Sequence, residues 1–253
     1  ANNNVDIQEF MIIPSNKFNF KDGLMKSVEV YTNLKSLLKE KGLSVSVGDE
    51  GGFAPNLKTS EEVLDLIILS IERTGLIYLD DISIALDCAA SELFSKDSYK
   101  LTGENKKFSS EEMIVYMQSL VDKYEIKSVE DPFDEKDWDA WKTFTKNNND
   151  LQIVGDDIFV TQEKILRKGI DSKVANSILV KLNQVGTLSE TMQAISLAKN
   201  SGYKTIISHR SGETEDSFIA DLAVAVDAGQ IKTGAPARSD RTAKYNRLLL
   251  IED

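Results

Sequence analysis

Cysteine, histidine, proline and tryptophan are scarce in this 253-residue sequence, with 1, 1, 4 and 2 copies respectively. The single cysteine, Cys88, cannot form a disulfide within the chain, which is typical of a protein in a reducing compartment. The sequence has no apolar run long enough to cross a membrane as a helix. We therefore expect a cytoplasmic protein without a membrane span.

Positive charge is also in short supply. Lysine and arginine total 30 against 41 acidic residues, so the net charge is 30 − 41 = −11. Such a balance argues against nucleic acid as the main partner. It also means that an anionic substrate would have to be met by local cations or metal ions. The first residues, Ala-Asn-Asn-Asn-Val, contain neither an initiator methionine nor a signal peptide, so we expect a fragment of a longer protein or a processed chain.

Short apolar segments alternate with longer amphipathic ones along the whole chain. Strands are predicted at 8–14, 44–47, 82–88, 126–132, 151–157, 177–184, 203–210 and 230–234. Helices are predicted at 21–41, 59–75, 109–124, 135–146, 161–168, 187–200, 215–228 and 238–251, and 99–108 is expected to be a polar excursion. This alternation is typical of βα units around a parallel sheet, either an open doubly wound sheet or a closed (β/α)8 barrel.

Ionisable residues occur in almost every predicted strand, at or near its end. They are Glu9, Asp87, Glu130, Asp156, Lys181, His209 and Lys232. In a barrel the carboxyl ends of all strands converge on one mouth, whereas in an open sheet only those near the switch point converge. Because no G-x-G-x-x-G or Walker pattern follows the first strand, we favour a barrel that forms one domain over residues 1–253.

Three of these acids, Asp87, Glu130 and Asp156, end successive βα units. Carboxylates in one mouth repel each other unless a cation lies between them, and oxygen-only ligands suit Mg²⁺. The alternative for each acid is that it caps the next helix or pairs with a lysine. Asp131 and Asp157, directly after two of the acids, would then orient the ligands or cap helices.

Lys181 lies in the apolar segment 177–184. Burial disfavours the charged form of a lysine and so makes it a usable base, although such a lysine can also reach solvent or form a structural ion pair. Arg210 and Ser211 suit a phosphate or carboxylate, and His209 precedes them. The glycine-rich stretch 47–55 could place Glu50 over a site or could be a plain turn.

The combination of eight motifs resembles the enolase family from Ala1 to Asp253. The motifs are Gln8-Glu-Phe-Met, Val47-Gly-Asp-Glu-Gly-Gly, Leu86-Asp-Cys, Val129-Glu-Asp-Pro-Phe, Gly155-Asp-Asp, Val180-Lys-Leu-Asn-Gln, Ser208-His-Arg-Ser-Gly-Glu and Gly229-Gln-Ile-Lys-Thr-Gly-Ala. The resemblance implies an enolase-type barrel fold. It also implies a lyase activity that interconverts 2-phosphoglycerate and phosphoenolpyruvate with Mg²⁺. It also implies a homo-oligomer in the full-length enzyme, and some enolases are reported at cell surfaces.

Residue roles follow from the resemblance alone. Lys181 matches the base that removes the α-proton, and Glu50 matches the acid that helps hydroxide to leave, with Glu9 close to it. The remaining matches are Asp87, Glu130 and Asp156 as Mg²⁺ ligands, Arg210 and Ser211 as phosphate contacts, Lys232 as a carboxylate contact, and Gln8 and His209 as residues lining the pocket.

The sequence also departs from the family pattern. No residues here match the N-terminal α+β domain, its mobile serine loop that reaches a second Mg²⁺, or the first barrel strand. By resemblance 44–47 belongs to an inserted loop, so seven of eight barrel strands are expected. We therefore expect this chain alone to be inactive or nearly so. The alternatives are a superfamily member that acts on another carboxylate and a catalytically silent fragment that serves as a binding or assembly module.

Overall fold

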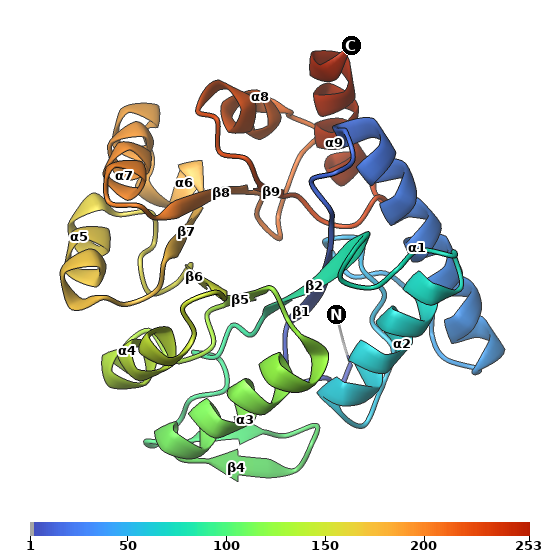
Figure 1. Ribbon diagram of the computed structural model, residues 1–253, viewed down its shortest axis with the longest axis horizontal. Coiled ribbons are helices and arrows are strands. Elements are labelled where there is room, and N and C mark those ends of the chain that lie inside the picture. Colours follow the sequence, from blue (N-terminus) through green and yellow to red (C-terminus); the bar gives the residue numbers. More distant parts are fainter. Residues whose placement is uncertain (1–2) are drawn as a thin grey trace.

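A computed structural model describes residues 3–253, and its centre is a curled sheet of seven strands (Figure 1). The order across the sheet is β1-β2-β5-β6-β7-β8-β9. The bounds are Glu9–Pro14 (β1), Ile82–Asp87 (β2), Ser128–Glu130 (β5), Gln152–Gly155 (β6), Ser177–Val180 (β7), Lys204–Ser208 (β8) and Ile231–Lys232 (β9). All pairings from β2 to β9 are parallel, as expected of strands joined by helical crossovers.

The helices lie around the outside of this sheet (Figure 1). They are α1 (Phe20–Glu40), α2 (Ser60–Glu72), α3 (Ser110–Tyr124), α4 (Trp138–Asn147), α5 (Glu163–Ser172), α6 (Leu182–Val185), α7 (Leu188–Asn200), α8 (Phe218–Ala225) and α9 (Ser239–Glu252). The last helix lies against the first, because the Glu252 carboxylate accepts hydrogen bonds from the Phe20 and Lys21 amides at 2.7 and 2.9 Å. The helical layer is thus tied together at the point where the sheet has its two edges.

The closed, parallel barrel favoured from the strand ends alone differs from the structure in two respects, of which the resemblance already implied the second, an incomplete barrel. The first strand, β1, is antiparallel to β2, with Glu9 opposite Asp87. Glu9 is therefore the first residue of its strand and not near its carboxyl end, yet the antiparallel direction brings it to the same end of the sheet as Asp87. Within residues 3–253 no pairing joins β1 to β9, so the sheet is a partial barrel. Its seven strands agree with the number that the resemblance implies.

Two predicted segments differ from the structure. Segment 44–47, predicted as a strand from its alternation, is instead part of a loop, as the resemblance implied, and contributes only an isolated bridge from Val47 to Phe53. The polar excursion at 99–108 is a small hairpin, with β3 (Tyr99–Leu101) paired to β4 (Lys106–Phe108). Its Tyr99 and Leu101 are fully buried, which explains why alternate residues there are apolar.

Helix starts follow the capping chemistry of the sequence in most cases. Ser109 and Glu112 form a reciprocal capping box at α3, and the Thr59 and Thr187 side chains accept hydrogen bonds at the starts of α2 and α7. The expected cap at Thr161 is wrong, since α5 begins two residues later without a side-chain cap. The Thr161 hydroxyl instead accepts a hydrogen bond from the Lys181 amide at 3.0 Å.

The core lies between the sheet and the helical layer. Strand residues such as Ile84, Val129 and Ile178 are fully buried, as are helix residues such as Leu64 and Trp141. Each such side chain contributes about 1.5–3 kcal/mol through its removal from water. This packing holds the strand ends, and with them the polar side chains that follow each strand. Among the helices of residues 3–253, none combines the length and apolarity that spanning a membrane requires.

Candidate active site

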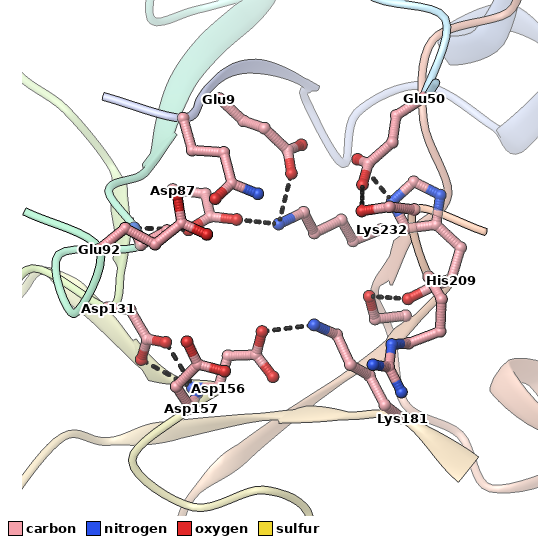
Figure 2. Close-up of a pocket in the computed structure, with 15 residues that line it drawn as sticks. Glu9, Glu50, Asp87, Glu92, Asp131, Asp156, Asp157, Lys181, His209 and Lys232 are labelled. Atoms are coloured by element: carbon pink, nitrogen blue, oxygen red, sulfur yellow. Dashed lines mark hydrogen bonds and ion pairs between the residues drawn. The ribbon is translucent and has the colours of Figure 1, made fainter. Parts of the chain in front are cut away.

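The carboxyl ends of the parallel strands surround a polar cavity of about 240 Å³ (Figure 2). Twelve of the residues singled out from the sequence line it: Gln8, Glu9, Glu50, Asp87, Asp131, Asp156, Asp157, Lys181, His209, Arg210, Ser211 and Lys232. Glu130, which is 3% exposed, reaches the site through a hydrogen bond from Lys232. The structure thus brings these residues together at one cavity, whereas their chemical roles stay predictions.

Lys232 is the centre of one ionic cluster. Its ammonium lies 2.6 Å from Asp87, 2.9 Å from Glu130 and 3.3 Å from Glu9. Burial by itself would lower the pKa of Lys232, but the charges of Asp87 and Glu130 outweigh burial and raise that pKa well above its ordinary value. The ammonium is therefore held in its charged form by carboxylates from three different strands.

Three carboxylates around one ammonium leave an excess of negative charge. Burial and the charge of Asp87 raise the pKa of Glu130 well above its ordinary value. For Asp87, burial acts in the same direction, but Lys232 reverses it and lowers the pKa. Burial and the crowding of carboxylates thus favour the neutral form of Glu130. An oxygen-rich, over-negative cluster of this kind fits a hard divalent cation such as Mg²⁺.

A second cluster lies across the cavity (Figure 2). Lys181 Nζ lies 2.5 Å from Asp156 Oδ2, and both side chains are mostly buried. The strand β7 ends at Val180, so Lys181 follows the strand and is not within it, which corrects the predicted 177–184 strand. The Lys181 amide donates a hydrogen bond to the Thr161 hydroxyl, which fixes the main chain at this point, and the Lys181 side chain lines the cavity.

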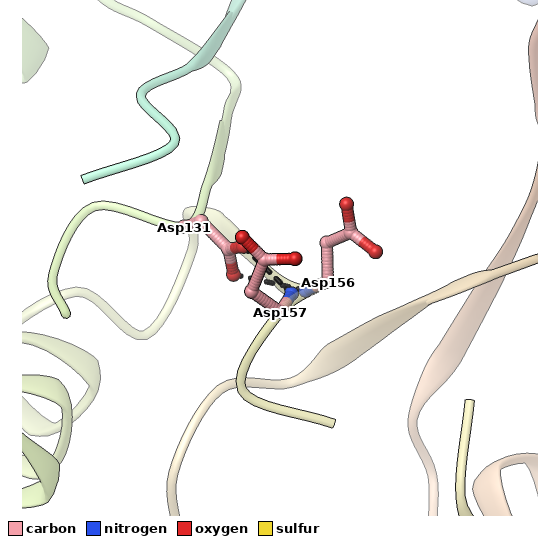
Figure 3. A group of neighbouring side chains, drawn as sticks. All are labelled: Asp131, Asp156 and Asp157. Carbon is pink, nitrogen blue, oxygen red and sulfur yellow. Dashed lines mark hydrogen bonds between the residues drawn. The ribbon is translucent and has the colours of Figure 1, made fainter. Parts of the chain in front are cut away.

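Asp131, Asp156 and Asp157 form an acidic trio at this wall (Figure 3). The Asp131 carboxylate accepts hydrogen bonds from the Asp156 amide at 2.9 Å and the Asp157 amide at 2.7 Å. Among residues 3–253, this is the group of three carboxylates in which one oxygen from each lies within 4.8 Å of the others. It shares only Asp156 with the metal ligands that the resemblance implies, because Asp87 and Glu130 are drawn to Lys232.

Glu50 enters the cavity from the glycine-rich loop. Its Oε1 accepts a hydrogen bond from Ser211 Oγ at 2.9 Å, and its main-chain carbonyl accepts one from the Ala235 amide at 2.8 Å. Its Oε2 is buried, forms no well-aligned hydrogen bond within residues 3–253, and lies 3.1 Å from His209 Nε2. The stretch is therefore not a plain turn, since it is fixed against two other loops.

The pKa values of Glu9 and Glu50 are shifted in opposite directions. Burial raises the pKa of Glu9 to about 8 although Lys232 opposes the shift. Burial acts on Glu50 as well, but the neighbouring His209 outweighs it and lowers the Glu50 pKa well below its ordinary value. Two neighbouring carboxyl groups with pKa values driven apart are a common arrangement for holding one proton between them.

Several residues that hold the site were not singled out from the sequence. Arg241 and Lys244 on α9 are fully buried, Gln184 on α6 reaches Asp156 Oδ1 at 3.4 Å, and Glu92 lines the cavity. Arg210, which was singled out as a phosphate contact, donates a hydrogen bond to Asn183 Oδ1 at 2.9 Å near the surface. Arg241 and Lys244 could have been recognised in the sequence from their positions on the inner face of an amphipathic helix, where a charged residue requires a partner.

Comparison with known proteins assigns the chain to a family. A family model described as the enolase C-terminal TIM barrel domain matches residues 1–253. A curated protein named enolase from Natranaerobius thermophilus is 55% identical over 254 residues, a match that covers the whole of this chain. The chain spans 60% of the length of that relative. With a family match over its full length and a polar site at the ends of its strands, the chain belongs to the enolase family.

Proposed function

We propose that the protein carrying this chain is a lyase that catalyses the Mg²⁺-dependent, reversible dehydration of 2-phosphoglycerate to phosphoenolpyruvate. One observation carries the proposal: Lys181 and Glu50 reach into one cavity from opposite walls (Figure 2). Elimination of water from a 2-phosphorylated acid requires a base for the α-proton and an acid for the departing hydroxide on the neighbouring carbon. Two groups on opposite sides of the substrate can perform both steps without moving.

Lys181 is the proposed base. Its ammonium is held by Asp156, so it becomes a base only when that carboxylate is neutralised or is drawn elsewhere. Ligation of Mg²⁺ by Asp156, together with Asp87 and Glu130, would have this effect. The bound cation would supply stabilisation of the doubly charged enolate that proton removal creates. Asp131 and Asp157, next to Asp156, would orient that ligand.

Glu50 is the proposed acid, in partnership with Glu9. The pKa of Glu50 is low and that of Glu9 is about 8, so Glu9 is the member of the pair that holds a proton near neutral pH. A proton shared between the two carboxyl groups can be passed to the leaving hydroxide and returned in the reverse reaction. His209, buried at 2% exposure beside Glu50, belongs to the same wall.

Cationic and polar groups around the cavity suit the two anionic ends of the substrate. Arg210 and Ser211 come from the loop after β8 and are proposed to contact the phosphate. Lys232 is proposed to contact the substrate carboxylate, and Gln8 lines the same wall. Arg210 and Lys232 would provide the local positive charge that an anionic substrate requires in a chain whose net charge is −11.

The test is to add 2-phosphoglycerate to the full-length protein that carries this chain, since the chain alone is expected to be inactive or nearly so, and to follow phosphoenolpyruvate by its absorbance with and without Mg²⁺. We expect formation that requires Mg²⁺ and is abolished by a chelator. Another sugar acid or phosphorylated acid that is converted while 2-phosphoglycerate is not would overturn the proposal. Binding of 2-phosphoglycerate without conversion under any metal condition would favour the binding or assembly role instead.

A further inference from the structure

Arg241, in the first turn of α9, has an unusual set of partners for a buried arginine. Its side chain is fully buried, yet within residues 3–253 neither Nη atom donates to a carboxylate. The nearest acid is Asp240, whose Oδ2 lies 3.4 Å from Nε, and Nε makes no hydrogen bond within residues 3–253. A buried charge is costly unless its donors are used, so the acceptors that Arg241 does reach are informative.

The two Nη atoms of Arg241 bind two separate loops. Nη2 donates to the carbonyl oxygen of Asp49 at 3.0 Å, directly before Glu50. It also donates to the Ser211 carbonyl at 2.8 Å, and Nη1 donates to the Arg210 carbonyl at 2.7 Å. One guanidinium thus clips the loop that carries the proposed acid to the loop that carries the proposed phosphate contacts.

The fourth acceptor is the ring of His209. Arg241 Nη1 lies 2.6 Å from His209 Nδ1. Arginine stays protonated in proteins and has only donors, so His209 Nδ1 must be the acceptor and must carry no proton. A neutral imidazole then has its single proton on Nε2, the atom that lies 3.1 Å from the buried Oε2 of Glu50. The contact with Arg241 therefore selects the one tautomer that can donate to Glu50.

The charges around the ring agree with a neutral imidazole. The charged groups that act on the His209 ring are Glu50 from the glycine-rich loop, Arg241 from α9 and Lys232 from β9, of which Glu50 and Arg241 contact it. Burial lowers the pKa of His209, Arg241 and Lys232 act in the same direction, and Glu50 opposes them. The net result is a lowered pKa, so the ring stays neutral near pH 7.

We propose that Arg241 is a positioning residue, which holds His209 as the Nε2–H tautomer beside Glu50 and joins the Glu50 and Ser211 loops into one unit. The catalytic part of this proposal rests on the proposed role of Glu50 as the acid. The structural part, the tautomer, stands independently of any reaction.

The direct test is NMR of the histidine ring in ¹⁵N-histidine-labelled protein. His209 is the only histidine among these 253 residues, and its signals are assigned by their loss in His209→Gln. We expect the wild-type ring near pH 7 to carry a proton on Nε2 and none on Nδ1. A proton on Nδ1, alone or with one on Nε2, would overturn the proposal without the need for any variant.

Variants distinguish a specific effect of Arg241 on His209 from a general structural effect of α9. Arg241→Met removes all four donated hydrogen bonds and is expected to raise the His209 pKa and to populate the Nδ1–H form. Arg241→Lys keeps a charged donor and is expected to retain the Nε2–H form. The matched control is Lys244→Met, which removes another buried cation of α9, bound to Glu213 and the Thr214 carbonyl but not to His209.

Lys244→Met is expected to leave the tautomer and the His209 pKa unchanged. An equal change in both Met variants would mean that α9 acts only as general support, and it would overturn the proposal. In kinetics we expect Arg241→Met to lower kcat about 100-fold with a smaller change in KM, since displacement of a reacting group by about 1 Å has effects of this size. If the wild type forms no phosphoenolpyruvate, the proposed function fails, while the NMR result still decides the proposal on Arg241.

Discussion

Gly234, just after β9, lies against the loop that carries Glu50. Its φ is +83°, and a Cβ added there would lie 2.6 Å from the Glu50 carbonyl oxygen and 2.8 Å from Arg241 Cδ. The next residue, Ala235, donates its amide to the same Glu50 carbonyl. Gly234→Ala therefore pushes directly on the backbone that positions the proposed acid.

Gly229, just before β9, offers a matched control. Its φ is +73°, but an added Cβ would meet nothing within 4 Å. Both alanine variants bear the left-handed backbone cost of about 1–2 kcal/mol, which lowers Tm by about 2–8 °C in a chain of this size. Only Gly234→Ala adds the overlap, which is expected to destabilise by about a further 1–3 kcal/mol.

The activity of the two variants should differ more than their stability. Relief of the overlap requires the Glu50 carbonyl to move by roughly half an ångström, and displacements of about 1 Å can cost about 100-fold in rate. We expect Gly234→Ala to lower kcat about tenfold or more, and Gly229→Ala to stay within about threefold of wild type. The assay is phosphoenolpyruvate absorbance well below the Tm of either variant. Equal kcat values in the two variants would refute the steric argument.

Three further predictions concern charge, metal and capping. The folded pKa of Glu9, about 8, lies above its ordinary 4.5, so its stabilising contribution is present below pH 4.5 and is lost as pH rises through 8. Chemical denaturation of the metal-free protein should show this loss, at most about 1.4 kcal/mol per pH unit, and Glu9→Gln should lack it. Calorimetry with Mg²⁺ should show that Glu130→Gln abolishes binding while Asp157→Asn only weakens it; the reverse order would assign the metal to the acidic trio. Ser109→Ala should lower the stability by about 1 kcal/mol, and no change would contradict the role of its capping box.

Much of the site could be predicted from the sequence because strand ends are easy to recognise. Asp87, Glu130 and Asp156 each follow a short apolar segment, and parallel strands bring such positions together. The direction of the first strand could not be predicted in this way. A strand has the same side-chain alternation whichever way it runs, so nothing near Glu9 indicated that β1 is antiparallel.

The supports of the site were harder to predict than the site itself. Arg241 lies 32 residues from His209 and 192 from Asp49 in the sequence. Most of its acceptors are main-chain carbonyls, which every residue has, so residue types cannot identify them. Thr161 followed the pattern of a helix cap, but its hydroxyl is used by the Lys181 amide of a distant strand end. In both cases tertiary contacts decided the partner of a polar side chain, and local patterns do not contain that information.

In the proposed reaction Lys181 removes the α-proton of 2-phosphoglycerate, and exchange of that proton with solvent deuterium measures this step directly. In the protein with Mg²⁺ in D₂O, NMR should show loss of the α-proton signal at a rate at least as fast as turnover. Lys181→Ala should abolish the exchange while 2-phosphoglycerate still binds. Exchange at the wild-type rate in Lys181→Ala would show that another group is the base.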